Sequence, residues 1–190
     1  MALTALDPKT ALVVVDLQKG LVSLPTVRPI DDIIKNSAAL ADAFRRRQLP
    51  VVLVNVAGGA PGRTEQAHSA ERPAGWTDLI PDLHQQRLDH LVTKRTWGAF
   101  TNTDLDAHLN GAGVTQIVLA GVATSIGVES TARNAYELGY NVTLAVDAMT
   151  DRRAEAHDYS VTQVFPRLGE TGTTKRIIDL LSAMVFGAAR

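Results

Sequence analysis

The sequence predicts an α/β protein with three layers, α-β-α, in which helices flank both faces of a parallel sheet. Short apolar runs rich in β-branched residues alternate with longer helix-forming segments, an order typical of strands joined by right-handed crossovers. The clearest unit covers residues 118–147. An apolar run ends at Gly121, a polar turn leads into a helix-forming segment closed by Gly139, and a second apolar run begins at Val142. This succession of strand, helix and strand is the unit of a parallel sheet.

The first quarter of the chain supplies two strands and the helix between them. Residues 11–16 read Ala-Leu-Val-Val-Val-Asp, a continuous apolar run typical of a strand buried on both faces. Pro29 and Asp31 begin a predicted helix that ends in the three arginines of residues 45–47. Acid at the start and base at the end suit the helix dipole. Residues 51–56 are the second predicted strand.

Residues 57–89 interrupt this alternation. Glycines and prolines punctuate a polar stretch that has no helix or strand period. A long irregular insertion in a compact domain is commonly a lid or an oligomer contact, and we expect one of these two roles here. His68, His84 and His90 do not have the spacing of metal ligands, so we expect them at the surface.

The second half of the chain returns to the alternating pattern. Thr103 or Asp104 is expected to cap a helix that ends at Leu109. A later helix should stop at Pro166, because proline disrupts a helix interior. The whole chain, residues 1–190, is expected to be a single domain. The predicted strands are residues 90–93, 115–120 and 142–147. One predicted helix lies between Gly121 and Gly139, and two others cover residues 154–165 and 173–184. Residues 185–190 are expected to fray.

Composition excludes several classes of function. The chain has 190 residues, of which 45% are hydrophobic and 21% charged, as in an ordinary globular protein. A net charge of −1 gives no electrostatic reason to expect nucleic acid or a membrane surface as a partner. No signal peptide is visible, so we expect a cytoplasmic protein. The absence of cysteine excludes disulfides, thiolate metal sites and a cysteine nucleophile.

Three separate regions place polar or turn residues at the ends of predicted strands. Asp16 ends the first strand, Lys94 follows the third, and the turn 121–127 follows the central one. An acid at the end of a buried strand is costly unless it is paired, so Asp16 has either a capping or a functional role. Because the carboxyl ends of parallel strands share one edge of the sheet, we expect the three regions to meet in one crevice.

Several of these motifs, in this order, resemble the isochorismatase-like (cysteine hydrolase) superfamily. The resemblance covers nearly the whole chain and implies the same three-layer fold, in homodimers or higher homo-oligomers, acting on a small-molecule substrate. The motifs are Leu-Val-Val-Val-Asp-Leu-Gln at 12–18, Lys-Arg-Thr-Trp-Gly-Ala-Phe at 94–100 with Thr-Asp-Leu at 103–105, Gly-Val-Ala-Thr at 121–124, Thr-Ala-Arg-Asn-Ala at 131–135, Gly-Tyr at 139–140 and Asp-Ala at 147–148.

The resemblance implies a catalytic trio of Asp, Lys and Cys. Asp16 and Lys94 match two members of the trio, and Gly127 stands at the position of the cysteine nucleophile. The family also has a cis peptide bond before the nucleophile, which would fall between Val122 and Ala123. The nearby hydroxyls of Ser125 and Ser130 are expected to cap or pack rather than to replace the thiol.

Other residues are expected to line the site around this trio. Gln18, Trp97 and Phe100 are expected as walls of the substrate pocket, although both aromatic residues suit the core or an interface equally well. The backbone amides of Val122, Ala123 and Gly127 would form an anion-binding nest. Nicotinamidase relatives have an Asp-x-His metal site after the second strand, where this chain reads Asn-Val-Ala at 55–57. No metal and no cofactor are therefore implied.

The sequence is compatible with three functions. The first is a small-molecule hydrolase that acts without a cysteine nucleophile. Isochorismatases proper, some of which carry glycine at the nucleophile position, are thought to cleave a vinyl ether by acid chemistry, and Asp16 would be the acid or base here. They typically have an aromatic residue where this chain has Ala123. The second function is a catalytically silent binding protein on the same scaffold, and the third is an oligomer-forming subunit that makes contacts through residues 57–89.

Overall fold

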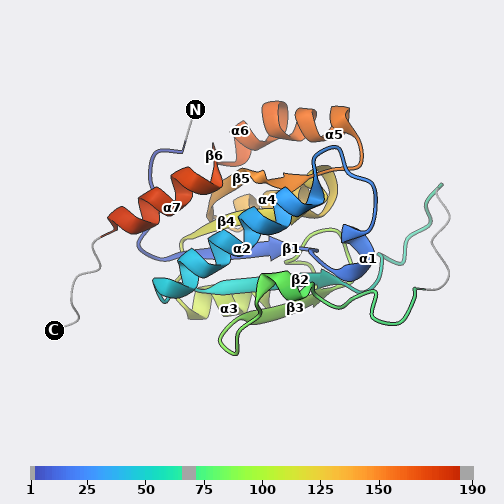
Figure 1. Cartoon of the computed structure of the whole chain (residues 1–190), viewed down its shortest axis with the longest axis horizontal. Helices are drawn as coiled ribbons and strands as arrows, with labels where there is room; N and C mark the ends of the chain where they lie inside the picture. Colours follow the sequence, from blue (N-terminus) through green and yellow to red (C-terminus); the bar gives the residue numbers. More distant parts are fainter. Residues whose placement is uncertain (1–2, 66–71, 185–190) are drawn as a thin grey trace.

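A single all-parallel sheet of six strands, in the order β3-β2-β1-β4-β5-β6, forms the middle layer of the molecule (Figure 1). The structure, a computed structural model, describes residues 3–65 and 72–184. The predicted three-layer α-β-α class is confirmed. The strands are β1 (Thr10–Val15), β2 (Val51–Val56), β3 (His90–Lys94), β4 (Gln116–Val122), β5 (Asn141–Thr150) and β6 (Glu170–Gly172).

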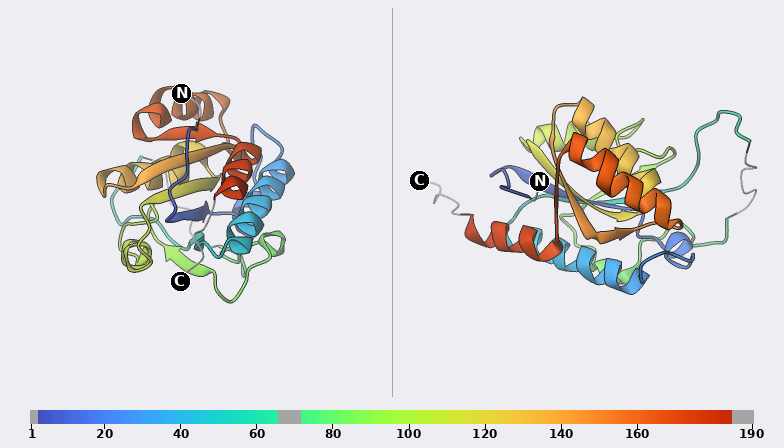
Figure 2. Two further views of the ribbon diagram at one scale, coloured as in Figure 1. Left: turned by 90° about the vertical axis from the view of Figure 1, so that its left-hand side faces the viewer. Right: turned by 90° about the horizontal axis from the view of Figure 1, so that it is seen from above.

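Helices cover both faces of the sheet (Figure 2). One core lies between the sheet and α2 with α7, and the other lies between the sheet and α3, α4 and α6. The helices are α1 (Lys19–Val22), α2 (Ile30–Arg46), α3 (Leu105–Gly111), α4 (Glu129–Glu137), α5 (Ala154–Tyr159), α6 (Phe165–Leu168) and α7 (Thr174–Ala183), with a 3-10 turn η1 (Pro81–Leu83) and two π-helical turns, η2 (Thr124–Val128) and η3 (Ser160–Val164).

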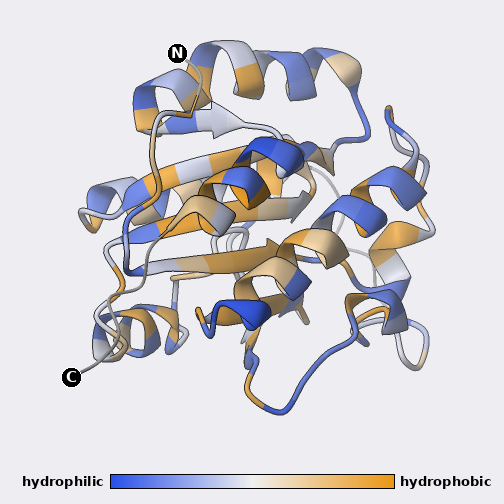
Figure 3. Cartoon of the chain, turned by 60° about the vertical axis from the view of Figure 1, so that its left-hand side comes forward, coloured by the Kyte–Doolittle hydropathy of each residue, from blue (hydrophilic) through white to orange (hydrophobic). Residues whose placement is uncertain are grey.

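Alternation along β1 explains why its sequence is an unbroken apolar run. Leu12 and Val14 face the α2 side, whereas Val13 and Val15 face the α4 side, and all four are buried. A strand covered on both faces has no solvent side, so the period-two pattern of an exposed sheet is absent. In Figure 3 the central strands are mostly hydrophobic, and the helices that flank them carry both hydrophobic and hydrophilic residues.

The expectation that a helix stops at Pro166 is wrong. Helix α6 continues through this residue to Leu168. The π-helical turn η3 comes immediately before α6, so Pro166 falls in the first turn of a new helix. A proline there needs no intrahelical N–H partner, which removes the usual reason for the helix to end.

Two short elements carry no clear sequence signal. Strand β6 is only Glu-Thr-Gly and pairs with β5 at the edge of the sheet. Helix α1 is a single turn of four residues. Elements this short show no measurable period, so their neighbours rather than their own sequence determine their conformation.

The insertion at residues 57–89 is irregular in its described parts, 57–65 and 72–89. Residues 58–65 extend away from the sheet (Figure 2). The later part does not: Ile80 and Leu83 are buried in the core beside α2. His68 lies outside the described residues, His84 is exposed, and His90 is half-buried rather than at the surface. No helix in the described part of the chain is long and apolar enough to cross a membrane.

Candidate active site

Asp16 lies immediately after β1, at the carboxyl edge of the sheet. Its backbone has a φ of +57°, which is uncommon for a residue other than glycine but which aspartate tolerates better than most. The Asp16 N–H donates to the Val54 carbonyl at 2.8 Å, and the Asp16 carbonyl accepts from the Gln18 N–H at 2.9 Å. This sharp turn keeps the carboxyl group inside the protein, where the residue is 4% exposed.

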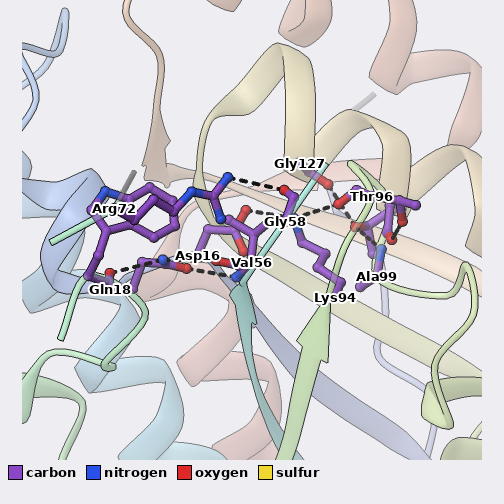
Figure 4. Close-up of polar contacts among 12 residues, drawn as sticks. Asp16, Gln18, Val56, Gly58, Arg72, Lys94, Thr96, Ala99 and Gly127 are labelled. Atoms are coloured by element: carbon purple, nitrogen blue, oxygen red, sulfur yellow. Dashed lines mark hydrogen bonds and ion pairs between the residues drawn. The ribbon is translucent and has the colours of Figure 1, made fainter. Parts of the chain in front are cut away.

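Lys94, the last residue of β3, pairs with Asp16 (Figure 4). Its Nζ donates to Asp16 Oδ2 at 2.7 Å and to the Thr96 carbonyl at 3.3 Å. Because β2 lies between β3 and β1, the ion pair joins strands that are not neighbours in the sheet. Both side chains are almost completely buried, so water screens their attraction very little.

The two carboxyl oxygens of Asp16 differ in their surroundings. Oδ2 accepts from Lys94, whereas Oδ1 is buried and has no hydrogen-bond partner among the described residues. Burial raises the pKa of Asp16 from 3.8 to about 6, and the Lys94 ammonium opposes that rise. Desolvation therefore outweighs the ion pair, and both protonation states of Asp16 are accessible near neutral pH.

Gly127 lies opposite Asp16, in the π-helical turn η2 that follows β4. The peptide bond between Val122 and Ala123 is cis, as the family resemblance predicts. A Cβ atom at Gly127 would lie 3.1 Å from Asp16 Oδ2 and 3.2 Å from the Val122 carbonyl oxygen. A side chain at position 127 would thus start beside the carboxyl group of Asp16. The structure brings Asp16, Lys94 and Gly127 together, and their chemical roles stay predictions.

The predicted pocket walls occupy varied places. Gln18 is fully buried: its Nε2 donates to the Val56 and Trp76 carbonyls at 3.2 and 3.1 Å, and its Oε1 accepts from the Val56 N–H at 2.7 Å. These bonds join β2 to the insertion. Trp97 is 66% exposed, whereas Phe100 packs beside the second core with its ring centroid 5.8 Å from that of Tyr140. Any contact of these side chains with substrate remains a prediction.

The predicted anion nest is in the turn that begins at the end of β4. Val122 is buried, and the Ala123 carbonyl accepts from the N–H groups of Ile126 and Val128 at 3.1 and 3.2 Å. Anion binding by the Val122, Ala123 and Gly127 amides stays a prediction. Asn55, which stands where nicotinamidases begin their metal motif, donates its Nδ2 to the Thr77 carbonyl at 2.8 Å. In the described ranges, no group of three or more His, Cys, Asp or Glu side chains could hold a metal.

One positioning contact was not predicted from the sequence. The Thr131 hydroxyl donates to the Gly127 carbonyl at 2.7 Å and accepts from the Ala99 N–H at 3.1 Å. It therefore joins the loop after β3 to the turn after β4. A Cβ on Gly98 would clash with Asn134 Oδ1, which favours glycine in that loop. The only sequence signal for these contacts is the Thr-Ala-Arg-Asn motif, whose partners lie far away in the chain.

The fold and the site together define a three-layer α/β hydrolase, with a buried acid and lysine at the carboxyl edge of a parallel sheet. The family model of the isochorismatase domain matches residues 10–176. The chain therefore belongs to the isochorismatase family of hydrolases.

Individual relatives agree with this assignment. The isochorismatase family protein YwoC of Bacillus subtilis is 43% identical over 182 residues, which cover 90% of this chain and 93% of YwoC. An isochorismatase family structure from Burkholderia thailandensis superposes with a TM-score of 0.90 at 43% identity, covering 94% of this chain and 98% of that one. The N-carbamoylsarcosine amidase of Thermoplasma acidophilum superposes with a TM-score of 0.73 at 27% identity, covering 87% and 96% of the two chains.

Proposed function

We propose that the protein is a small-molecule hydrolase that works without a cysteine nucleophile and uses Asp16 as its general acid and base. The observation that carries this proposal is the state of the Asp16 carboxyl group. Its pKa is raised to about 6, and Oδ1 has no partner in the described part of the chain while Lys94 holds Oδ2. A general acid is most effective when its pKa lies near the working pH, so this carboxyl group can both give and take a proton.

The candidate reaction is hydrolysis of a vinyl ether of the isochorismate type. Protonated Asp16 transfers its proton to the terminal enol carbon, and the ether carbon becomes an oxocarbenium ion. Water adds to that carbon and returns a proton to the Asp16 carboxylate. The resulting hemiketal then collapses to a ketone and an alcohol. One water molecule is consumed, and Asp16 ends the cycle protonated, as it began.

Lys94 and Gly127 would support this reaction in different ways. The Lys94 ammonium, 2.7 Å from Asp16 Oδ2, stabilises the carboxylate that is left after proton transfer. Gly127 puts no side chain beside the acid, at a position where a Cβ would be only 3.1 Å from Asp16 Oδ2. The chain contains no cysteine, so the thioester route of cysteine amidases is closed to it.

The second candidate function is a catalytically silent protein that binds a small molecule. The observation that favours it is the close pairing of Asp16 and Lys94, whose side chains are 2.7 Å apart and almost completely buried, as in a purely structural ion pair. In such a protein the pair would be a structural ion pair, and the loss of the thiol would have ended catalysis. The homodimer or larger assembly implied by the family resemblance belongs to both proposals, and light scattering tests it.

Turnover of a compound panel separates the two functions. The panel contains vinyl ethers, amides and imides, and each compound is tested with the wild-type protein and with Asp16→Asn. The hydrolase proposal expects turnover of a vinyl ether by the wild type and its loss in the variant. A compound that raises the melting temperature of both proteins without being consumed supports the binding protein instead.

A further inference from the structure

The segment after β5 holds the turn that carries Gly127. Asp151 follows β5 directly, and because Thr150 is the register partner of Val122, Asp151 comes beside the start of that turn. Asp151 Oδ2 accepts from both the N–H and the hydroxyl of Ser125, each at 2.8 Å. Its Oδ1 accepts from the Arg152 N–H at 2.7 Å. The carboxylate is 3% exposed, and both of its oxygens are used.

A second contact comes from α5. His157 is 1% exposed, and its Nδ1 lies 2.8 Å from the hydroxyl oxygen of Thr124, which is also fully buried. Burial lowers the pKa of His157, and the Arg28 guanidinium lowers it further, so the ring is neutral at neutral pH. His157 Nε2 has no hydrogen-bond partner among residues 3–65 and 72–184. The ring therefore makes its one observed polar contact with the turn.

A third contact lies just beyond Gly127. The Ser160 hydroxyl donates to Glu129 Oε2 at 2.6 Å, so the first residue of α4 is also attached to the segment after β5. Thr124, Ser125 and Glu129 thus each have a side-chain bond to residues 151–160. Gly127, which lies between them, has no side chain with which to hold its own position. Its backbone is held by its neighbours and by the Thr131 hydroxyl.

We propose that Asp151 and His157 are positioning residues, which hold Ser125 and Thr124 and so set the distance between the Gly127 backbone and the Asp16 carboxyl group. The gap is small, because a Cβ at position 127 would be 3.1 Å from Asp16 Oδ2. A shift of a few tenths of an ångström is therefore a large fraction of the space available. As a statement about catalysis this inference rests on the proposed function, but the position of residue 127 can be measured without turnover.

A thiol introduced by Gly127→Cys is the probe. The chain has no cysteine of its own, so alkylation by iodoacetamide reports on this one position. The rate depends on the fraction of thiolate, which the helix N-terminus and Lys94 raise and the Asp16 carboxylate lowers. Asp151→Ala in this background removes the carboxylate and its bonds to Ser125. Asp151→Asn removes the charge but keeps an oxygen that can accept from the Ser125 N–H.

Asp147, a residue of β5, provides a matched control. Its Oδ1 also accepts from a backbone N–H and a hydroxyl, those of Thr174, at 2.7 and 2.9 Å, but it holds the first residue of α7 rather than the turn after β4. Asp147→Ala should therefore cost a comparable amount of stability and leave residue 127 in place. The neutral change Thr124→Val tests the His157 contact without altering charge, and it also serves if Asp151→Ala does not fold.

We expect Asp151→Ala to slow alkylation at pH 7 by at least about fivefold, because the thiolate loses its stabilising neighbours. Asp151→Asn should recover most of the rate, Thr124→Val should slow it by about twofold or more, and Asp147→Ala should not change it. Equal rates in Asp151→Ala and Asp147→Ala would overturn the inference. So would equal effects of Ala and Asn at position 151, which would reveal a charge effect alone.

The two proposals can fail separately. If the alkylation rates follow the expected order but no compound is hydrolysed, the positioning role stands and the hydrolase proposal fails. If a vinyl ether is hydrolysed and Asp151→Ala changes neither the alkylation rate nor kcat, the hydrolase proposal stands and the positioning role fails. The alkylation assay needs no substrate, so its outcome is independent of the compound panel.

Discussion

Strand β3 has an ion pair between buried side chains at each of its ends, and the two pairs differ in how many oxygens of the acid are hydrogen-bonded. Asp89 immediately precedes the strand and pairs with Arg45, whose Nε and Nη2 donate to Asp89 Oδ1 and Oδ2 at 3.1 and 2.7 Å. The Gln86 N–H also donates to Oδ2 at 2.7 Å. Lys94 ends the strand and pairs with Asp16, whose Oδ1 has no partner in the ranges described.

Both pairs combine an acid with a base away from water, so burial and charge do not distinguish them. The two pairs are distinguished by the number of carboxyl oxygens that have a hydrogen-bond partner. A carboxylate with both oxygens hydrogen-bonded within the protein is satisfied in the folded state. A buried carboxyl group with one open oxygen is costly for the fold, and this cost is the physical reason to look for function there. The comparison therefore assigns Asp89 to structure and makes Asp16 the candidate acid.

Neutralising each acid in turn should have the largest effect on activity. Asp16→Asn cannot exchange a proton at a useful pH, so we expect turnover to fall by about 10²–10⁴. Asp89→Asn should leave kcat essentially unchanged, because Asp89 lies at the amino end of β3, whereas the candidate site lies at the carboxyl ends of the strands. Steady-state kinetics on a compound that the wild type hydrolyses decides the matter. Full kcat in Asp16→Asn would make Asp16 purely structural.

Stability should show the opposite ranking of sites. Asp89→Ala leaves the Arg45 guanidinium with only Asp42 Oδ1 at 3.1 Å and the Leu83 carbonyl at 3.0 Å as partners among the described residues. Breaking a buried pair costs up to about 3–5 kcal/mol of unfolding free energy, and we expect a cost toward the lower end of that range here. Asp179→Ala is the control, because the Lys175–Asp179 pair is exposed and such pairs contribute about 0–1 kcal/mol. Urea denaturation measures both. A cost for Asp89→Ala no greater than that of the control would show that the buried pair is not structural.

The raised pKa of Asp16 predicts a pH dependence of both stability and activity. The folded pKa of about 6 lies above the ordinary value of 3.8, so the folded state holds this proton more tightly than the unfolded chain does. That contribution to stability is present below pH 3.8 and is lost as the pH rises through about 6. If protonated Asp16 is the acid, kcat/KM should fall about tenfold per pH unit above 6. A profile that is flat from pH 5 to 8 would contradict this.

The smallest expected effect concerns the thiol of Gly127→Cys. Lys94 and the helix N-terminus favour a thiolate at this position and the Asp16 carboxylate opposes it, and we expect the thiol pKa to lie below the free value of about 8.5. Adding Lys94→Ala should raise the pKa again and slow alkylation. Arg45→Ala, which removes the cation at the other end of β3, should not. Identical effects of the two substitutions would mean that alkylation reports general loosening rather than the local charge.

Local patterns in the sequence were sufficient to predict the architecture. Apolar runs without alternation mark strands buried on both faces, and right-handed crossovers then place their carboxyl ends on one edge. Asp16, Lys94 and Gly127 could be predicted to meet because each lies at such an end. Strand β6 and the helix through Pro166 could not, because the first is too short for a pattern and the second depends on a π-helical turn that has no sequence signature.

Only the tertiary structure decided which side chains are partners. Lys94 reaches Asp16 across β2, and Asp151 reaches Ser125 because β5 lies beside β4; both pairings depend on the strand order. Periodicity predicts which face of an element is buried, because residues that share a face recur at a fixed spacing along the chain. Whether Asp16 Oδ1 stays open while both oxygens of Asp89 are occupied depends on groups far away in the sequence. Sequence patterns thus place the candidate site at the carboxyl ends of the strands, and three-dimensional packing decides which buried acid keeps an oxygen without a partner in the described part of the chain.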